Sequence, residues 1–352
     1  MMIFSKKILR WFDSEGRHNL PWQQNPTPYR VWVSEIMLQQ TQVGTVIPYF
    51  ERFMTHFPTV ESASEALLDN VLKLWSGLGY YGRARNLHKT ARVISQTYHG
   101  VWPREVAALE RLPGIGRSTA GAIASLAFNI PAPILDGNVK RVLSRVYAID
   151  GKPLAQEKHL WELAYSLLPQ KRPGHYNQAL MDLGATLCTK QKPRCTLCPV
   201  QKDCLAFRHN RVAEYPSSII KPPKPIRHKY FLLISSKDQK HLLLYQRPLS
   251  GIWGGLWSLP EIEYDENWTE CLMNCLADFK LDLLHAESLT IKKHTFTHFT
   301  LYLHPIAVTI PSMKRAHLEK AGFYWHKMGQ EYPGGIPAPI HRLLLAWRQV
   351  PV

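Results

Sequence analysis

The chain has 352 residues, of which 45% are hydrophobic and 11% aromatic; this composition excludes a disordered protein, and the length exceeds what one hydrophobic core usually serves. Lysine and arginine outnumber aspartate and glutamate by 16, so we expect an anionic partner. Residues 1–212 hold 27 basic and 15 acidic residues, against 16 and 12 in residues 213–352, which places a nucleic-acid surface mainly in the first part.

The N-terminus lacks the basic start, apolar core and cleavage site of a signal peptide. The longest apolar stretch, residues 120–135, is interrupted by Asn129, Pro131 and Pro133, so no membrane helix is expected. These features predict an intracellular protein with no membrane partner.

Up to about residue 212, apolar residues recur at the spacing of amphipathic helices, beginning at Ile8 and continuing through 46–57, 67–75 and 106–112. A Pro/Lys-rich linker follows at 213–228. Beyond it, 230–234 and 241–245 predict buried strands on either side of a turn, and 299–308 predicts another strand. The expected fold class is therefore multidomain, with an all-α domain at 1–212 and an α+β domain at 229–352.

Four of the six cysteines lie within seventeen residues, with the spacing Cys188-x6-Cys195-x2-Cys198-x5-Cys204. In a chain without a secretion signal, such clustering indicates a metal site rather than disulfides. Thiolates at this density can surround a [4Fe–4S] cluster or a zinc ion, but structural zinc sites more often pair two C-x2–4-C units, and only the central pair has that form. The whole spacing resembles the iron–sulfur loop of the endonuclease III superfamily of DNA glycosylases, which implies a [4Fe–4S] cluster, with zinc and free core thiols as alternatives.

Residues 112–121, Leu-Pro-Gly-Ile-Gly-Arg-Ser-Thr-Ala-Gly, separate two helical stretches. Gly114 and Gly116 permit a tight turn, and the backbone N–H groups that open the next helix near Arg117 form an anion site. The motif resembles the helix-hairpin-helix of the same superfamily, which implies a grip on one DNA phosphate; the alternative is an ordinary corner between two helices.

Two carboxylates have contrasting surroundings. Asp136 precedes a helical stripe that begins at Val139, so it is expected to cap that helix and, because it accepts backbone N–H bonds, to stay ionised. Glu35 lies in a helix that Thr27 and Pro28 begin and that is apolar almost all round. Burial raises the pKa of such a glutamate, which suits a general acid; the alternative is a core carboxylate in a hydrogen-bond network. An acid beside an anionic stabiliser is what cleavage of an N-glycosidic bond requires.

Several strings resemble the adenine DNA glycosylases of the MutY family, within the endonuclease III superfamily. They are Leu20-Pro21-Trp22, the stretch 34–42 around Glu35, Gly77-Leu78-Gly79-Tyr80-Tyr81, the hairpin, Leu135-Asp136-Gly137-Asn138, and the cysteine loop. The resemblance covers nearly the whole chain. It implies a helix-hairpin-helix near 109–125 and an iron–sulfur loop at 188–204.

By this resemblance, Glu35 protonates N7 of a flipped adenine, Asp136 stabilises the sugar cation, directly or through a transient covalent adduct, and Asn138 helps to place the attacking water. The adenine pocket is lined by Trp22, Gln23 and Gln178, and the side chains that wedge into the duplex are Gln40 and Tyr80. Core packing is the alternative for Trp22 and Tyr80, and solvent exposure for the two glutamines.

Ser118 stands where bifunctional relatives carry a Schiff-base lysine. A serine hydroxyl cannot form an imine, so the resemblance implies a monofunctional enzyme that leaves the abasic strand intact.

The second domain resembles the Nudix fold, with Gln246-Arg247-Pro248 and the stretch 251–260. The acids after Pro260 do not repeat at helical spacing, so metal-dependent hydrolysis is not expected. The resemblance instead implies recognition of 8-oxoguanine by Phe296, Thr297 and His298, with threonine in place of the family's serine; a plain hairpin tip is the alternative.

The resemblance thus implies a monomer of the bacterial cytoplasm that acts on double-stranded DNA containing 8-oxoguanine:A or G:A mispairs. Two other functions share some of these features: an endonuclease III-like bifunctional glycosylase and lyase, and a non-catalytic lesion-binding protein. Ser118 argues against the first, and the two carboxylates argue against the second.

Overall fold

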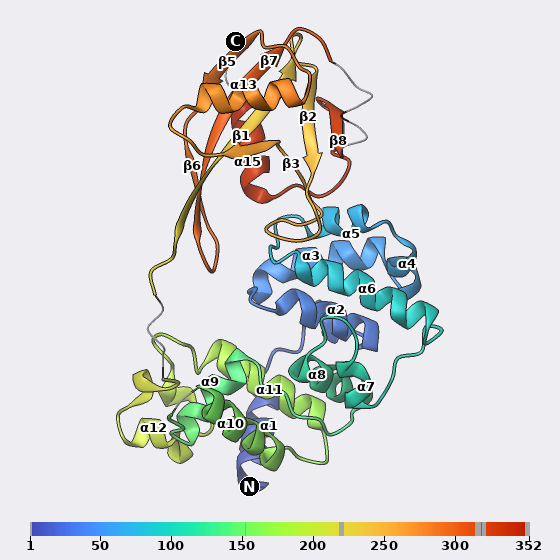
Figure 1. Cartoon of the computed structure of the whole chain (residues 1–352). Coiled ribbons are helices and arrows are strands. Elements are labelled where there is room, and N and C mark those ends of the chain that lie inside the picture. Colours follow the sequence, from blue (N-terminus) through green and yellow to red (C-terminus); the bar gives the residue numbers. More distant parts are fainter. Residues whose placement is uncertain (1, 152, 218–221, 314–317, 319–321, 349–352) are drawn as a thin grey trace. The chain divides into compact units, whose positions relative to one another are not determined.

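The computed structural model describes residues 2–151, 153–217, 222–313, 318 and 322–348 (Figure 1). The chain divides into two compact units, each made of two stretches of sequence. The first unit comprises Met1–Ala66 and Arg85–Ile220, and the second comprises Leu67–Ala84 and Lys221–Val352. The domains expected from the sequence at 1–212 and 229–352 stay a prediction. Residues 218–221 of the expected linker lie outside the described residues.

The first unit is helical, as predicted, and no described helix is both long and apolar enough to cross a membrane. The helices expected at 46–57 and 106–112 are present as α3 and α7. The α-helices are α1 Met2–Glu15, α2 Pro28–Leu38, α3 Val43–His56, α4 Val60–Glu65, α6 Gly82–Gln96, α7 Val106–Glu110, α8 Arg117–Phe128, α9 Gly137–Val146, α10 Pro153–Leu167, α11 Pro173–Thr186 and α12 Leu205–Arg208, with α6 beginning in the second unit. Short 3-10 turns follow at η1 Pro21–Gln23, η2 Cys195–Leu197, η3 Gln201–Asp203 and η4 Val212–Glu214.

Helix α2 begins and packs as its sequence predicts. The hydroxyl of Thr27 accepts a hydrogen bond from the backbone N–H of Arg30 at 3.3 Å, and Pro28 occupies the first turn, where a missing N–H costs nothing. Seven of its eleven residues are buried, because α3 and α8 pack against it. A second core is built from apolar side chains of α1, α9, α10 and α11.

The second unit contains helix α5 (Leu68–Trp75) and an eight-stranded sheet. The predicted strands are confirmed as β1 Ile226–Ser236, β2 His241–Gln246 and β7 Thr300–Ile310. Strands β1 and β7 pair in parallel over their whole length, and the path of the sheet is β3-β2-β1-β7-β5. The remaining strands are β3 Trp257–Ser258, β4 Glu261–Glu263, β5 His285–Ser288, β6 Lys292–Thr295 and β8 Phe323–Lys327.

Alternate residues of the strands bury against a helix. Leu232 and Ile234 of β1 and Ile306 of β7 share a core with Leu272 and Leu276 of α13 (Trp268–Asp278), which crosses the sheet in Figure 1. The period-2 pattern of buried side chains is thereby satisfied on this face. A last helix, α15, spans Ala338–Arg348.

One glycine controls the approach of α11 to α9. A Cβ at Gly184 would lie 2.6 Å from the Cβ of Asn138 and 3.0 Å from its Cα. We expect Gly184→Ala to destabilise the protein by about 1 to 3 kcal/mol, because an added methyl group must displace α9. Thermal unfolding measures the change. Gly137→Ala is the matched control, since no atom lies within 4 Å of a Cβ there; equal melting temperatures for the two variants would contradict the expectation.

Candidate active site and cysteine pocket

Glu35 lies on the buried helix α2 but keeps some solvent exposure, as a group that meets a substrate must. Burial, and then the negative charge of Asp136, raise the pKa of Glu35 to about 8. Among the described residues, no hydrogen bond or ion pair reaches its carboxyl. Glu35 is therefore mainly protonated at neutral pH, as a general acid needs to be. The alternative of a carboxylate within a hydrogen-bond network is wrong for the described part of the chain.

Asp136 caps α9, as predicted. Its carboxylate accepts hydrogen bonds from the backbone N–H groups of Asn138 at 3.1 Å and Val139 at 2.8 Å, and from the Asn138 amide at 3.0 Å. Burial raises the pKa of Asp136, whereas these three bonds and the Arg141 charge lower it. The hydrogen bonds thus favour the anion as expected, but the expectation omitted burial, which outweighs them and leaves the pKa above the ordinary value.

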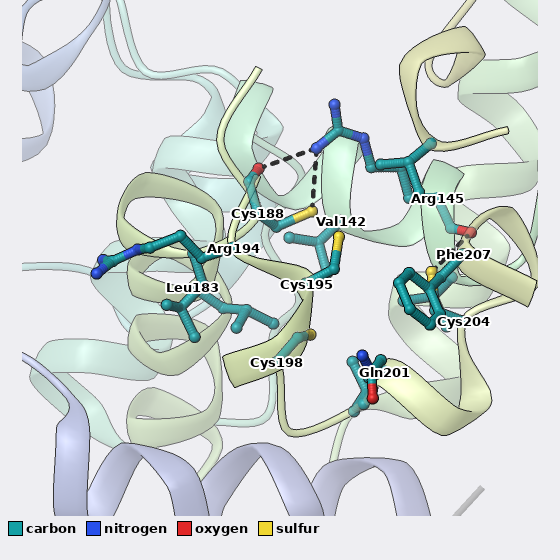
Figure 2. Close-up of a pocket in the computed structure, with 14 residues that line it drawn as sticks. Val142, Arg145, Leu183, Cys188, Arg194, Cys195, Cys198, Gln201, Cys204 and Phe207 are labelled. Atoms are coloured by element: carbon teal, nitrogen blue, oxygen red, sulfur yellow. Dashed lines mark hydrogen bonds between the residues drawn. The ribbon is translucent and has the colours of Figure 1, made fainter. Parts of the chain in front are cut away.

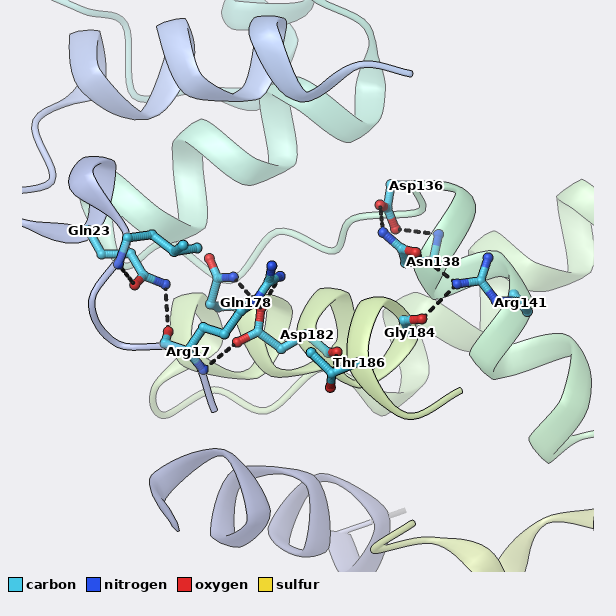
Figure 3. Close-up of polar contacts among 10 residues, drawn as sticks. Arg17, Gln23, Asp136, Asn138, Arg141, Gln178, Asp182, Gly184 and Thr186 are labelled. Atoms are coloured by element: carbon cyan, nitrogen blue, oxygen red, sulfur yellow. Dashed lines mark hydrogen bonds and ion pairs between the residues drawn. The ribbon is translucent and has the colours of Figure 1, made fainter. Parts of the chain in front are cut away.

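Arg141 holds Asn138 from the other side. Its guanidinium donates to the Asn138 side-chain oxygen at 2.8 Å and to the Gly184 carbonyl at 2.7 Å (Figure 3). A third bond reaches the Cys188 carbonyl at 2.7 Å. Both ends of the Asn138 amide are therefore engaged, one by Asp136 and one by Arg141. Such a side chain has little rotational freedom.

The two predicted pocket glutamines are tied to one ion pair, between Arg17 and the fully buried Asp182 (Figure 3). Gln178 donates its amide N–H to Asp182 at 2.9 Å, and Gln23 donates to the Arg17 carbonyl at 2.9 Å. The Gln178 side-chain oxygen has no hydrogen-bond partner among the described residues. Trp22 is 5% exposed and packs edge-on against another ring, so core packing accounts for most of its surface.

The two predicted wedge residues share an unusual backbone conformation. Gln40 has φ 56° and Tyr80 has φ 49°, in the left-handed region that non-glycine residues rarely adopt. Both side chains are exposed. Strained, exposed positions of this kind are concentrated at functional sites. Gln40 belongs to the first unit and Tyr80 to the second.

The hairpin between α7 and α8 has the predicted form. Gly114 has φ 75° and lies against Asn86, and Gly116 caps α8. The exposed Arg117 stacks over Trp161, with its guanidinium carbon 4.0 Å from the ring centroid. The backbone N–H groups at the start of α8 thus open onto a basic, exposed surface.

Ser118 connects the hairpin to the segment that carries Asp136. Its hydroxyl accepts a hydrogen bond from the backbone N–H of Leu135 at 3.1 Å, one residue before Asp136. The serine thus holds the segment that carries the carboxylate. This role could not be seen in the sequence.

The loop 296–299 is the tip of a hairpin between β6 and β7. The Phe296 N–H donates to the Phe299 carbonyl at 2.8 Å, and the two rings stack at 4.6 Å. Thr297 and His298 are exposed at the tip. The loop is therefore stiffened at its base while two polar side chains remain accessible.

Of the acids after Pro260, Glu261 and Glu263 lie on strand β4, and Asp265 and Glu266 lie between that strand and α13. Glu261 of β4 pairs with Arg247 at 2.7 Å, and Glu263 pairs with Lys229 at 2.6 Å. These carboxylates thus hold the sheet together.

The four clustered cysteines line one pocket, together with apolar side chains of α9 and α11 (Figure 2). In the described part of the chain, no group of three or more His, Cys, Asp and Glu side chains lies close enough to hold a single metal ion. The sulfurs surround a space instead of converging on one point, an arrangement that fits the four corners of a [4Fe–4S] cluster better than zinc. Burial raises the pKa of Cys198 to about 12 and also raises those of Cys195 and Cys204, so burial by itself favours the thiol form of these three side chains.

Arg145 of α9 holds the backbone around this pocket. The side chain is 2% exposed and donates to the carbonyls of Thr189 at 2.7 Å, Lys190 at 3.2 Å and Tyr215 at 3.0 Å. A further bond reaches the Cys188 sulfur at 3.3 Å. The buried guanidinium therefore orders the backbone of the loop through these hydrogen bonds.

Comparison with known proteins fits this geometry. Residues 33–165 match the model of the HhH-GPD superfamily of base excision DNA repair proteins, and residues 230–346 match that of the NUDIX domain. An adenine DNA glycosylase from Buchnera aphidicola is 41% identical, with 97% of each chain covered. The chain belongs to the adenine DNA glycosylase family. It is thus a base excision repair enzyme, a hydrolase of N-glycosyl bonds, built from a helix-hairpin-helix domain and a Nudix-like domain.

More distant relatives agree. The rat adenine DNA glycosylase is 39% identical over 74% of this chain, which spans 60% of the rat protein. The structure of a thermostable thymine-DNA glycosylase aligns with a TM-score of 0.54 at 30% identity, covering 59% of this chain and 96% of that one. The glycosylase shares the helical fold of these enzymes.

Sequence reasoning missed the residues that hold the site of this glycosylase. Arg17, Asp182, Arg141 and Arg145 each act through a side chain or carbonyl far along the chain. One signal was available in the sequence. Asp182 and Arg145 are charged residues among the apolar residues that form the buried faces of their helices, and a buried charge usually has a partner.

Because the pKa of Glu35 is raised from 4.5 in the unfolded chain to about 8 in the folded one, folding opposes its ionisation. The contribution of the protonated Glu35 to the free energy of unfolding is therefore fully present below pH 4.5 and is lost as the pH rises towards 8. We expect Glu35→Gln to be more stable than the wild type by about 2 kcal/mol at pH 7, with a smaller gain at pH 5. Urea unfolding at both pH values measures the change. The exposed Glu51→Gln on α3 is the control, and an equal gain there would contradict the assignment.

Proposed function

We propose that this glycosylase hydrolyses the N-glycosidic bond of an adenine paired with 8-oxoguanine, or with guanine, in double-stranded DNA. The observation that carries the proposal is the pair of carboxyls in the first unit, one mainly protonated and one held by three hydrogen bonds. The negative charge of Asp136 contributes to the raised pKa of Glu35, which supports a shared site for the two groups.

In the proposed reaction, the Glu35 carboxylic acid gives its proton to N7 of the flipped adenine. The bond between C1′ and N9 then breaks, and its electron pair leaves with the base. The Asp136 carboxylate stabilises the resulting positive charge at C1′, directly or as a transient ester. Asn138 orients the water that attacks C1′, and the ionised Glu35 can accept the proton which that water loses.

The adenine pocket is proposed to use an acceptor that Asp182 orients. Since Asp182 binds the amide N–H of Gln178, the free oxygen of Gln178 can accept a hydrogen bond from the exocyclic amine of adenine. A base with a carbonyl at that position would meet a repulsive contact. Trp22 and Gln23 form the rest of the pocket.

DNA binding is assigned to three further sets of residues. The phosphate is held by the hairpin, at Gly114, Gly116 and Arg117; the duplex is opened by Gln40 and Tyr80; and 8-oxoguanine is read by Phe296, Thr297 and His298. The first set is supported by exposed N–H groups at the start of α8, the second by exposed left-handed positions, and the third by an exposed, stiffened hairpin tip.

The four cysteines are proposed to hold a [4Fe–4S] cluster. When bound, it supplies four iron–sulfur bonds that fix the loop 188–204, beside the Arg145 contacts. We further infer that the enzyme works as a monomer on chromosomal DNA in the bacterial cytoplasm, with a glycosylase domain at 1–212 and a lesion-reading domain at 229–352.

A duplex with 8-oxoguanine opposite adenine tests the reaction under single-turnover conditions. We expect cleavage of the adenine strand only after hot alkali, because Ser118 offers a hydroxyl and no amine. Cleavage without alkali would indicate lyase chemistry from another amine. No cleavage in either portion would favour a lesion-binding protein.

Glu35→Gln should lower the single-turnover rate constant by at least about 100-fold, because it removes the proton donor. In the wild type, the rate should fall as the pH rises through about 8, since the protonated acid is lost there. Glu51→Gln should keep both the rate and its pH profile. A pH-independent wild-type rate would refute the assignment of the acid.

Protein purified without oxygen should contain about four iron and four sulfide ions per chain, with the broad visible absorption of an iron–sulfur cluster. Cys198→Ser should reduce both contents and the melting temperature, whereas Cys271→Ser, outside the pocket, should not. One zinc ion per chain in place of iron would overturn the proposal.

A further inference from the structure

The second unit includes a helix far from the rest of it in sequence. Helix α5 carries Asp69, which accepts a hydrogen bond from the Gln246 amide at 3.0 Å, and Lys73, which pairs with Glu331 at 2.7 Å. Both contacts lie within the second unit. The segment 67–84 is therefore attached to the part of the chain that contains the sheet.

Two glycines bring the sheet domain close to this helix. A Cβ at Gly335 would lie 2.6 Å from the Leu72 carbonyl oxygen, and a Cβ at Gly255 would lie 3.1 Å from the Leu72 side chain. Leu72 is fully buried, as are the neighbouring Leu256 and nearly all of Ile336. The contact between α5 and the residues around Gly335 is thus apolar and close-packed, so the two segments move together.

The end of α5 is also fixed. Ser76 is the C-terminal cap of the helix, and its hydroxyl donates to the Ile336 carbonyl at 2.6 Å. This bond lies four residues before Tyr80. It joins the chain that leads into the Tyr80 turn directly to the backbone beside Gly335.

The backbone turn after α5, which carries Tyr80, is bonded to α5. The Trp75 indole N–H donates to the Gly79 carbonyl at 3.1 Å. Arg83 donates to the same carbonyl at 3.2 Å, and its guanidinium lies 5.4 Å from the Trp75 ring and 5.5 Å from that of Tyr80. Tyr80, in its left-handed conformation, therefore lies on a turn whose Gly79 carbonyl is bonded to Trp75 of α5 and to Arg83.

We propose that the packing of α5 on residues 246–257 and 331–336 positions Tyr80 for insertion into the duplex, with Ser76 and Gly335 as positioning residues. The inference rests on the proposed function. It means that the loop 296–299 and Tyr80 belong to one packed body, so recognition of 8-oxoguanine by that loop and opening of the helix by Tyr80 are coupled mechanically.

The test uses the full-length holoenzyme and a duplex in which 2-aminopurine neighbours the 8-oxoguanine:A pair. Its fluorescence rises when a side chain disturbs base stacking, and the alkali assay gives the excision rate. Ser76→Ala should lower both the fluorescence change and the rate, the latter by about 3- to 10-fold, because one hydrogen bond to the turn is lost. Gly335→Ala should have a larger effect.

Two matched controls isolate the contact. Ser166→Ala removes an exposed serine that also donates to a carbonyl, at Leu163, and Gly44→Ala adds a methyl group where no atom lies within 4 Å. Both should behave as the wild type. If Gly335→Ala does not fold, Ser76→Ala still decides, since it removes only a hydroxyl.

A general loss of structure is distinguished from mispositioning by two further measurements. On a duplex whose adenine is already unpaired in a bulge, Ser76→Ala should act at the wild-type rate, because no wedge is needed. Adding Ser76→Ala to Tyr80→Leu should cause no further loss. Additive losses, an equal defect on the bulge, or wild-type behaviour of Ser76→Ala would each overturn the inference, whereas a wild type that cuts nothing would instead refute the proposed function.

Discussion

The hydrogen bonds at the N-terminus of α9 hold the side chains of Asp136 and Asn138 in place. Asp136 accepts three of these bonds, and Arg141 fixes Asn138 from the opposite side. On the same helix, Arg145 binds the carbonyls of the cysteine loop. One helix of ten residues therefore supports both the carboxylate and the cysteine pocket, and Gly184 sets how closely α11 approaches it.

Burial of Glu35 lowers the stability of the folded protein at neutral pH, and the same burial keeps the Glu35 carboxyl protonated. Burial that raises the pKa of Glu35 also raises the pKa of Asp136, so the hydrogen bonds at α9 are needed to favour an anion that burial alone would neutralise. Two like groups in one poorly solvated region cannot both ionise cheaply. The two carboxyls differ in the hydrogen-bond donors that reach them: Asp136 accepts from three N–H groups, and Glu35 accepts from none among the described residues.

Local features of the sequence predicted much of this structure. Thr27 with Pro28 and Asp136 with its apolar stripe marked two helix starts that the structure confirms, and the nearly continuous burial of the C-terminal part of β1 and of β7 was visible as apolar runs. These signals depend on neighbours a few residues away. The ion pair of Arg17 with Asp182 joins residues 165 apart, and no periodicity encodes it. Burial of Asp136 likewise depends on which helices surround it, so its effect on the pKa could not be read from the cap alone.

The composition of the second unit has a consequence for how the chain is made. A ribosome completes residues 67–84 long before residues 331–336, against which α5 packs. At about 5 to 20 residues per second, roughly 10 to 50 s pass between the two. During that interval the apolar face of α5, including Leu72, has no native cover. A chain truncated before residue 331 would lack the contacts that Gly335 and Ile336 make with Leu72 and Ser76.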